Sequence, residues 1–402
     1  MSRITETARE KSEEIGDMIE LNLGPQHPST HGVLRIKLRL DGEVVVTADP
    51  VIGYLHTGIE KECETRTFLQ VFTLVDRLDY LSGPSEEQAY AGAVETLMGI
   101  EVPERAQTIR LMLLELARIG SHLLWIGTSA LELNMSSVYM YCFAEREKIL
   151  DLMEEISGAR MFPSIWRIGG LARDLPPDFE SHVRAFIENF PNTWKDLDAL
   201  LTENYVWVTR LKNVSIIDKN LSEQYMCTGP VIRAAGVPYD IRKVYPYLGY
   251  ETYDFDIPTR TEGDSYARYM VRLEEMLESI KLIDQTLKRL RPGPIITADR
   301  KIALPPRQEL VHNMEAVIHQ FKLVSEGISP PKGEVYNCVE SARGELGHYL
   351  VCDGGNRPHR LRVRSPSFPH IQVLKEVLPG LIISDVVVAI ASVDPILGDV
   401  DR

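Results

Sequence analysis

The stretch LNLGPQHPSTHGVLR, residues 21–35, decides how the first part of the chain folds. On either side of its loop, residues 18–23 and 33–40 roughly alternate apolar and polar side chains, a pattern typical of two strands. Between the strands, His27 and His31 lie in a loop that two prolines stiffen, because proline fixes φ and disfavours helix in the preceding residue. The sequence therefore predicts a hairpin with a stiff, non-helical tip that can position two imidazoles. An ordinary turn with two solvated histidines is the alternative that the loop alone leaves open.

Composition bounds the class of protein. At 402 residues and 45.5 kDa the chain can bury a large core in one domain or two. The net charge of -14 argues against a nucleic-acid partner, because phosphate binding needs a basic surface. No apolar run reaches the length of about 18 residues that a membrane-spanning helix needs. Residues 1–17 are mostly polar and charged, so a frayed helix is expected there rather than a signal peptide.

The cysteines and glycines exclude several kinds of site. The five cysteines are Cys63, Cys142, Cys227, Cys338 and Cys352. They form no Cys-x-x-Cys pair, so local motifs cannot supply a four-cysteine zinc or iron-sulfur site, and free thiols in a reducing compartment are expected. The chain also lacks a P-loop and a glycine-rich strand-to-helix turn, so no nucleotide or nicotinamide site is expected in it.

One long helix dominates the middle of the sequence. Apolar residues recur at helical spacing over residues 104–132, which predicts a long buried helix. Polar and aromatic residues form a stripe along one side of this helix. They are Glu115, Arg118, Ser121, His122 and Trp125. If this stripe lies in the core, its charges must be paired, because unpaired charges are expensive to bury. A face turned to solvent or to a partner subunit is the alternative.

The remaining patterns predict an α+β fold, a long-helix core with β elements at both ends. Further helices are expected over residues 59–68, 86–100, 139–156, 174–211, 265–291 and 307–325. Strand character is expected in the last part of the chain, at residues 333–336, 347–352 and 361–364. After an extension over residues 1–17, we expect a β-hairpin region (18–50), a mainly helical core (51–325) and a C-terminal β-containing region (326–402).

Six motifs in one order carry a resemblance to a known family. They are GPQHPSTHG (24–32), GYLHTGIEK (53–61), RLDY (77–80), RIGG (167–170), ESARGELG (340–347) and GDVDR (398–402). On these motifs, residues 18–402 resemble the 49-kDa-type subunit of NADH-quinone oxidoreductase, respiratory complex I. That family shares its fold with the large subunits of nickel-iron hydrogenases, so the resemblance implies a hydrogenase-large-subunit-like fold.

The resemblance also implies a ligand. Hydrogenases of this kind hold nickel and iron with two Cys-x-x-Cys pairs, but the corresponding stretches here, residues 67–80 and 394–398, contain no cysteine. The implied cavity therefore holds no metal and serves the head group of a quinone. Reducing a quinone requires proton donors beside both carbonyl oxygens, and by the motif match these are Tyr80 and His31. A phenol with pKa near ~10 and an imidazole near ~6.5 suit that task.

Further site residues follow from the resemblance alone. The quinone contacts would be His27, Thr30, Thr128, Glu132 and Val400, and the residues facing the terminal iron-sulfur cluster of a neighbouring subunit would be Arg77, Phe162 and Arg167. Glu132 takes the position of a carboxylate that orients the histidine ring, where an aspartate is usual. Phe162 stands where a histidine is common, so we expect a cluster potential that depends weakly on pH and is low enough to suit a quinone such as menaquinone.

The implied function is a quinone-reducing subunit of a proton-pumping enzyme, peripheral on the cytoplasmic side of the cell inner membrane. The chain would bind no cofactor by itself and would receive electrons from the iron-sulfur cluster of a 20-kDa-type subunit. Its other partners would be a 30-kDa-type subunit, a 23-kDa-type ferredoxin-like subunit and a membrane quinone-channel subunit. Two alternatives stay open: a homologous subunit of a complex driven by coenzyme F420 or ferredoxin, and a scaffold that has lost the site.

Overall fold

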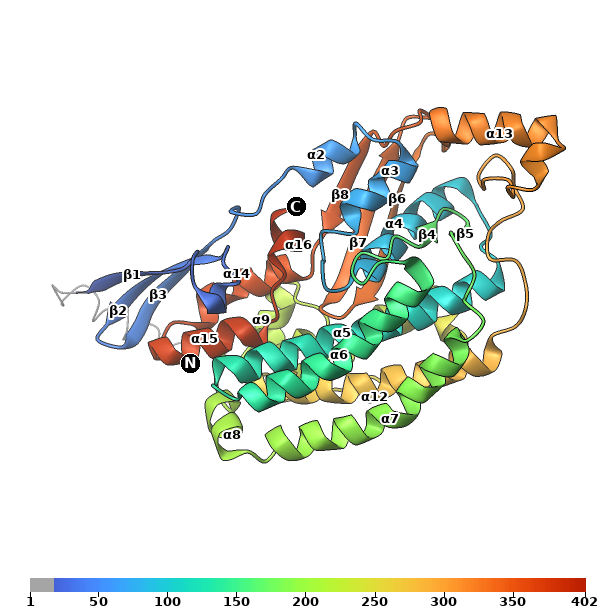
Figure 1. The fold of residues 1–402 in the computed structure, drawn as a ribbon. Coiled ribbons are helices and arrows are strands. Elements are labelled where there is room, and N and C mark those ends of the chain that lie inside the picture. The colour runs from blue at the N-terminus through green and yellow to red at the C-terminus, as the bar shows by residue number, and fades with distance from the viewer. Residues whose placement is uncertain (1–17) are drawn as a thin grey trace.

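The computed structural model describes residues 18–402, and the extension and frayed helix expected over residues 1–17 lie outside the described residues. Long helices form the middle of the molecule, and small antiparallel sheets lie in its N-terminal and C-terminal parts (Figure 1). The α+β fold that the sequence predicted is therefore confirmed. No helix of the described part is both long enough and apolar enough to cross a membrane.

The first sheet contains the hairpin that the residues around the two histidines predicted. Strands β1 (Ile19–Leu23) and β2 (Arg35–Asp41) pair antiparallel, and β3 (Val44–Val51), which was not among the expected strands, joins β2. Alternate apolar side chains of β2 are buried, which fixes its register. The loop between β1 and β2 contains one turn of 3-10 helix, η1 (Pro28–Thr30), so the expectation of a non-helical tip was wrong. Proline suits the first position of such a turn because its φ is already helical.

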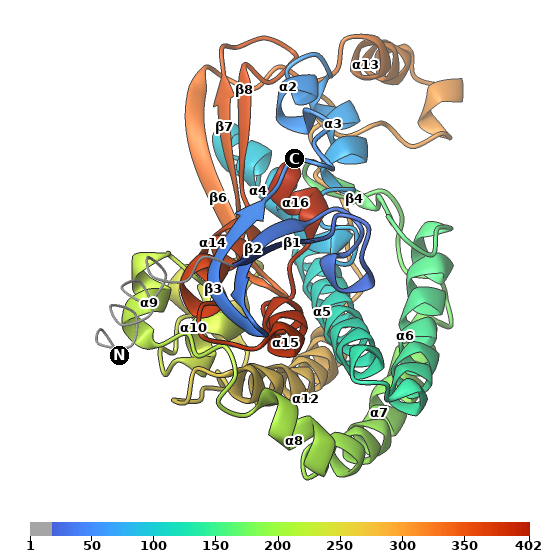
Figure 2. The same ribbon diagram turned by 90° about the vertical axis from the view of Figure 1, so that its left-hand side faces the viewer.

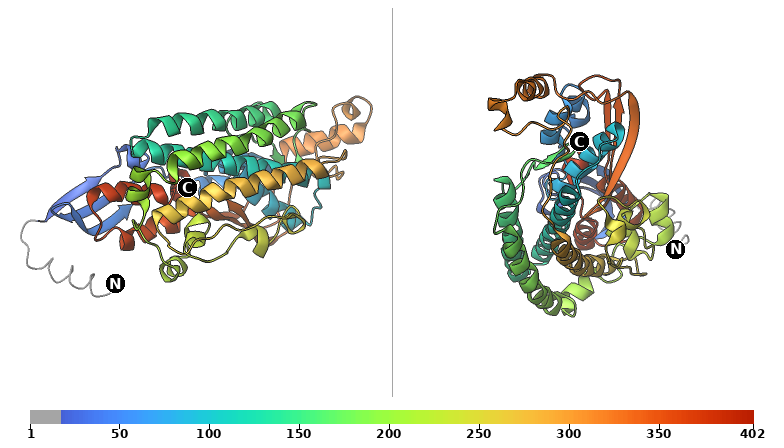
Figure 3. Two further views of the ribbon diagram at one scale, coloured as in Figure 1. Left: turned by 90° about the horizontal axis from the view of Figure 1, so that it is seen from below. Right: turned by 90° about the vertical axis from the view of Figure 1, so that its right-hand side faces the viewer.

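Four long helices lie side by side (Figures 1 and 3). They are α5 (Glu104–Glu132), α6 (Ser136–Ser157), α7 (Phe179–Leu201) and α12 (Ser265–Arg289). Helix α5 has the bounds that its apolar spacing predicted, and it contacts both α6 and α12. It is therefore the axis around which the other helices are arranged.

Shorter elements precede, connect or follow these helices. They are α2 (Ile59–Cys63), α3 (Phe68–Val75), α4 (Gly83–Met98), β4 (Trp166–Arg167), β5 (Gly170–Leu171), α8 (Tyr205–Leu211), α9 (Lys219–Gln224), α10 (Pro230–Ala234), α11 (Ile241–Val244), η2 (Tyr250–Thr252), η3 (Glu309–Val311) and α13 (Met314–Ser325). Three expected helices were too long, since residues 59–68, 174–211 and 307–325 are each broken into two elements. In the second of these, the Asn204 side chain accepts hydrogen bonds from two backbone N–H groups of α8 and starts a new helix there.

The C-terminal part forms the second sheet and three helices. These elements are β6 (Gly333–Ser341), β7 (Gly344–Cys352), β8 (Arg360–Arg364), α14 (Ser367–Val377), α15 (Ile383–Ser392) and α16 (Leu397–Asp401). The three strands were expected, and the three helices that follow β8 were not among the expected elements. These helices pack against the first sheet (Figure 2), and apolar side chains from both form one buried cluster.

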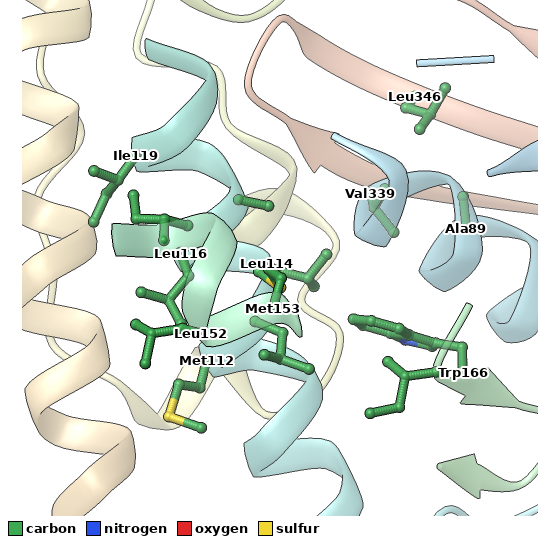
Figure 4. Close-up of a cluster of buried hydrophobic side chains, with 14 of the residues drawn as sticks. Ala89, Met112, Leu114, Leu116, Ile119, Leu152, Met153, Trp166, Val339 and Leu346 are labelled. Carbon is green, nitrogen blue, oxygen red and sulfur yellow. The ribbon is translucent and has the colours of Figure 1, made fainter. Parts of the chain in front are cut away.

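A larger apolar core joins the central helices to the second sheet. Figure 4 shows Met112, Leu114 and Leu116 of α5 in this core with Leu152 and Met153 of α6. Side chains of α4, β6 and β7 extend the same cluster. This packing fixes α4 and α5, which hold or adjoin the residues of the candidate site.

The polar stripe of α5 lies inside the core, so a face turned to solvent or to a partner was the wrong alternative. Glu115 accepts hydrogen bonds from Tyr250 and Ser279, both at 2.6 Å. Its carboxylate also lies 3.2 Å from a nitrogen of Arg118 and of Arg242. Desolvation, the largest influence, raises the pKa of Glu115, but the two guanidinium groups and the two hydroxyls outweigh it and lower the pKa to about 2. The buried charge is thus paired, as its burial requires.

Candidate functional site

The tip of the first hairpin is held by its own hydrogen bonds. The fully buried Thr30 hydroxyl donates to the carbonyl oxygens of Pro25 (3.1 Å) and His27 (2.9 Å). The Nδ1 atom of His27 accepts from the backbone N–H of Ser29 at 3.2 Å. His31 ends the turn in the left-handed region, at φ 54°, and is exposed at the surface of the chain. His27 and Thr30 therefore shape the loop, and His31 is the imidazole that the loop presents.

Glu132, the last residue of α5, lies beside this loop at Ser29. Burial raises the pKa of the Glu132 carboxyl to about 7, and the Ser29 side chain opposes the rise. Its Oε2 atom is buried and has no hydrogen-bond partner within residues 18–402. The charged groups that shift the pKa of His31 are Asp394 and Arg343, not Glu132. The structure thus connects Glu132 to the loop through Ser29 rather than to the His31 ring.

The raised pKa of Glu132 makes stability depend on pH. The folded chain keeps this proton up to about pH 7, whereas a free glutamate loses it near 4.5. The contribution of Glu132 to the free energy of unfolding is therefore fully present below pH 4.5. It is lost as the pH rises through 7, which lowers the free energy of unfolding by on the order of 1–3 kcal/mol. We expect Glu132→Gln to be more stable than the wild type at pH 8 and equally stable at pH 4. Thermal unfolding of the full-length chain at both pH values measures this, with the exposed Glu101→Gln as control; a Glu132→Gln chain that is less stable at pH 8 contradicts it.

Tyr80 lies in the short loop between α3 and α4. Its ring packs against Gly398 of α16, where an added Cβ would lie 3.4 Å from two ring carbons. The same Cβ would lie only 2.5 Å from the carbonyl oxygen of Leu78. Asp79, the preceding residue, is buried and accepts a hydrogen bond from the Leu81 backbone N–H at 3.1 Å. The loop is therefore fixed on both sides of Tyr80, and glycine is required at position 398 by close approach.

Tyr80 and Phe162 line one pocket, which lies between α4, α5, α6 and the segment before β4. The Arg77 guanidinium lies 5.4 Å from the centre of the Phe162 ring, over its face. Arg167 donates from Nη1 to the carbonyl oxygens of Ser164 (2.9 Å) and Trp166 (2.7 Å). The structure thus brings Arg77, Phe162 and Tyr80 together, and it places Arg167 in the adjoining segment.

His31 and Tyr80 are influenced by the same buried ion pair, Arg343 and Asp394. Burial raises the pKa of Tyr80; Arg343 opposes this rise, and Asp79 and Asp394 add to it. Desolvation by the surrounding protein lowers the pKa of His31; Asp394 opposes this fall, and Arg343 adds to it. Because electrostatic influence falls with distance, two rings that feel the same pair lie in one region of the molecule.

Thr128 and Val400 have other surroundings. The Thr128 hydroxyl donates to the carbonyl oxygens of Leu124 (3.0 Å) and Trp125 (3.2 Å) in its own helix. Val400 is buried in the apolar cluster between the first sheet and the C-terminal helices. Neither residue lines the pocket beside Tyr80.

The residues that the sequence did not single out are Arg343, Asp79 and Asp394. Arg343 and Asp394 stand in turns, next to a glycine and a proline, and Asp79 is inside the RLDY motif. Their charges within these motifs could have indicated them as candidate site residues. That all three are buried together is evident only from the structure. Among residues 18–402, no group of three or more His, Cys, Asp or Glu side chains is arranged to hold a metal ion.

Comparison with known proteins shows the family to which the chain belongs. A family model described as the 49 Kd subunit of respiratory-chain NADH dehydrogenase matches residues 132–402. The chain therefore belongs to the family of 49 kDa subunits of respiratory-chain NADH dehydrogenase. It is 72% identical over 402 residues to an NADH-quinone oxidoreductase subunit of Protochlamydia amoebophila, covering 100% of both chains.

More distant relatives agree over nearly the same length. An NADH-quinone oxidoreductase subunit of Roseiflexus castenholzii is 50% identical over 404 residues, covering 100% of this chain and 96% of the relative. An NADH-quinone oxidoreductase subunit of Chloroflexus aurantiacus is 51% identical over 385 residues, covering 95% and 94%. The chain is thus one subunit of an NADH-quinone oxidoreductase and part of an enzyme complex.

Proposed function

We propose that this chain forms the quinone-reducing site of its complex, with Tyr80 and His31 as the two proton donors. The observation that carries the proposal is the pocket that Tyr80 lines together with Phe162, beside the Arg77 guanidinium. Arg343 and Asp394 act on both Tyr80 and His31, which supports including His31 in the same site. The names of the relatives, which are quinone oxidoreductase subunits, support the same substrate class.

The two donors suit the two protons that quinone reduction consumes. The phenol of Tyr80 is neutral at pH 7 and can donate its O–H to one oxygen of the head group as electrons arrive. The lowered pKa of His31 keeps that ring neutral at rest. Negative charge that develops on the reduced quinone favours the charged imidazolium, so His31 acquires a donatable proton when one is needed.

The other residues support these two. His27, Thr30 and Glu132 hold the loop that carries His31. Thr128 and Val400 remain further candidate quinone contacts that rest on the resemblance alone. Quinone is the substrate, and this chain holds no cofactor of its own in the reaction. Its residues therefore bind the quinone, exclude water and supply protons, while electrons come from outside the chain.

We infer that the Arg77 and Phe162 side of the pocket, with Arg167 behind it, faces the terminal iron-sulfur cluster of a 20-kDa-type subunit. The other proposed neighbours are a 30-kDa-type subunit, a 23-kDa-type ferredoxin-like subunit and a membrane subunit through which the quinone enters. In this arrangement the complex pumps protons, and the chain is peripheral on the cytoplasmic side of the cell inner membrane.

Phe162 sets how the potential of that cluster responds to pH. Phenylalanine cannot titrate, so we expect the cluster potential of the wild-type complex to vary little between pH 6 and pH 8. Phe162→His places an imidazole with pKa near ~6.5 there and is expected to add a slope of up to about 59 mV per pH unit. Redox titration of the assembled complex measures the slope. Phe162→Leu is the matched control, and a wild-type slope as steep as that of Phe162→His contradicts the prediction.

Gly398→Ala tests whether α16 positions Tyr80. The new Cβ would lie 2.5 Å from the Leu78 carbonyl oxygen, so the loop must move away from α16. Because a misplacement of about 1 Å can lower a rate about 100-fold, we expect quinone turnover to fall at least about tenfold. Gly293→Ala is the control, since its Cβ would meet only Arg105 at an ordinary 3.8 Å. Steady-state quinone reduction by the assembled complex measures both, and equal turnover in the two variants contradicts the assignment.

A photoreactive quinone analogue tests the proposed function directly. The assembled complex is illuminated with the analogue, and the labelled peptides are identified by mass spectrometry. We expect label in residues 27–34 or 76–84 of this chain, and we expect excess unlabelled quinone to suppress it. Quinone-protected label that occurs only in other subunits would show that this chain is a scaffold and that the site lies elsewhere.

A further inference from the structure

Arg343 connects three separate segments inside the protein. It lies at the turn between β6 and β7 and is only 1% exposed. Its Nη1 atom donates to both carboxylate oxygens of Asp79, at 3.0 and 3.3 Å. Its Nη2 atom lies 3.3 Å from Oδ2 of Asp394, in the turn before α16. One guanidinium is thus clamped between a carboxylate of the Tyr80 loop and a carboxylate of the C-terminal turn.

This guanidinium keeps unused hydrogen-bonding capacity. In the described part of the chain, Nε and Nη2 of Arg343 and Oδ2 of Asp394 are buried without a hydrogen-bond partner. A guanidinium has five donors in a fixed plane, and leaving buried donors unpaired is unfavourable. The two carboxylates therefore keep the guanidinium positively charged, while two of its nitrogens form no hydrogen bond within residues 18–402.

Tyr80 is the neighbour that can use this charge. It directly follows Asp79, and its ring packs on Gly398, four residues beyond Asp394. The charged groups that act on Tyr80 are Arg343, Asp79 and Asp394, and Arg343 is the only cation among them. Asp399 of α16 also acts on Arg343 and is itself hydrogen-bonded by Ser365 at 2.5 Å.

We propose that Arg343, held by Asp79 and Asp394, is a positioning residue that stabilises the phenolate left when Tyr80 protonates the reduced quinone. In that step the O–H bond of Tyr80 breaks, and a new O–H bond forms on the quinone oxygen. The two electrons arrive one at a time from the iron-sulfur cluster of the neighbouring subunit, and the phenolate keeps the electron pair of its broken bond. Water from the solvent later returns a proton to the phenolate. The inference rests on the proposed function, because it takes Tyr80 as a donor.

A double-mutant cycle in the assembled complex tests the inference. Arg343→Met is combined with Asp394→Asn so that the net charge of the cluster is unchanged, and Arg343→Lys keeps a cation in place. We expect the Met/Asn variant to lower quinone turnover at least about tenfold and to raise the solvent deuterium isotope effect, because proton donation becomes slower. Arg343→Lys is expected to restore most of both values. In a Tyr80→Phe background, the Met/Asn change should cause no further loss.

The outcomes separate this inference from the proposed function. If Tyr80→Phe lowers turnover as expected but the Met/Asn change lowers it further in the Tyr80→Phe background, Arg343 has only a structural role and the inference is wrong. A Met/Asn variant with the wild-type isotope effect overturns the inference as well. A loss with Arg343→Lys as large as that with Met/Asn also overturns it. If Tyr80→Phe leaves turnover unchanged, the proposed function itself fails.

Discussion

Tyr80→Phe is expected to lower quinone reduction by the assembled complex by about 100-fold or more, while the iron-sulfur clusters are still reduced by NADH. A positioned general acid contributes about 10² to 10⁴ to a rate, and this substitution removes only the hydroxyl that donates the proton. The phenyl ring retains its packing against Gly398, so the loop stays in place. The loss therefore reports the O–H group and not a displaced backbone.

Two measurements on the same preparation make this result decisive. Steady-state quinone reduction gives the turnover. Electron paramagnetic resonance after addition of NADH shows whether the iron-sulfur clusters are reduced. The matched control is Tyr349→Phe on β7, which loses a 2.6 Å hydrogen bond to Glu334 far from the pocket and should leave turnover unchanged. Normal turnover with Tyr80→Phe would mean that the head group binds elsewhere, and this chain would then be a scaffold.

The parts of the fold that the sequence predicted are those whose pattern is local and long. Helix α5 was predicted from residue 104 to residue 132 because apolar residues recur at helical spacing along its whole length. The β1–β2 hairpin was predicted because two alternating segments flank a loop rich in glycine and proline. In both, the residues that form the element also show which face is buried.

The parts that were missed depend on distant segments. Strand β3 and helices α14, α15 and α16 are short, and they are stabilised chiefly by packing against one another and against the hairpin. The apolar run from residue 381 to residue 393 is too short to span a membrane, and most of it forms α15. A short apolar run does not by itself distinguish a strand from a helix, and only the packing decides.

The same limit applies to the site. The motif match supplied Tyr80 and His31, and the structure places both under the influence of one ion pair. It did not supply the clamp, because Asp79, Arg343 and Asp394 come from three parts of the sequence and meet only in the folded chain. Nor could the sequence show that Glu132 lies beside Ser29, since residue types alone do not determine which polar groups are close.

Arg233→Met is expected to lower the free energy of unfolding by about 3–5 kcal/mol, a large part of the total of about 5–15 kcal/mol for a folded protein. Arg233 is fully buried, and its guanidinium lies 2.7 Å from a carboxylate oxygen of Glu275 and 2.7 Å from one of Glu340. His122 of α5 contacts the other oxygen of Glu275 at 2.9 Å. Removing the cation leaves two carboxylates buried without their main partner, and this uncompensated charge causes the loss.

Chemical denaturation of the full-length chain measures the loss, and a second substitution tests its cause. If unpaired charge is responsible, Arg233→Met combined with Glu340→Gln should be more stable than Arg233→Met alone, although it removes one more native interaction. The matched control is Arg66→Met, whose exposed ion pair with Glu62 at 2.6 Å should contribute less than about 1 kcal/mol. If Arg233→Met and Arg66→Met lose the same free energy, the charges around Arg233 do not hold α5, α10, α12 and β6 together, and the apolar core alone must do so.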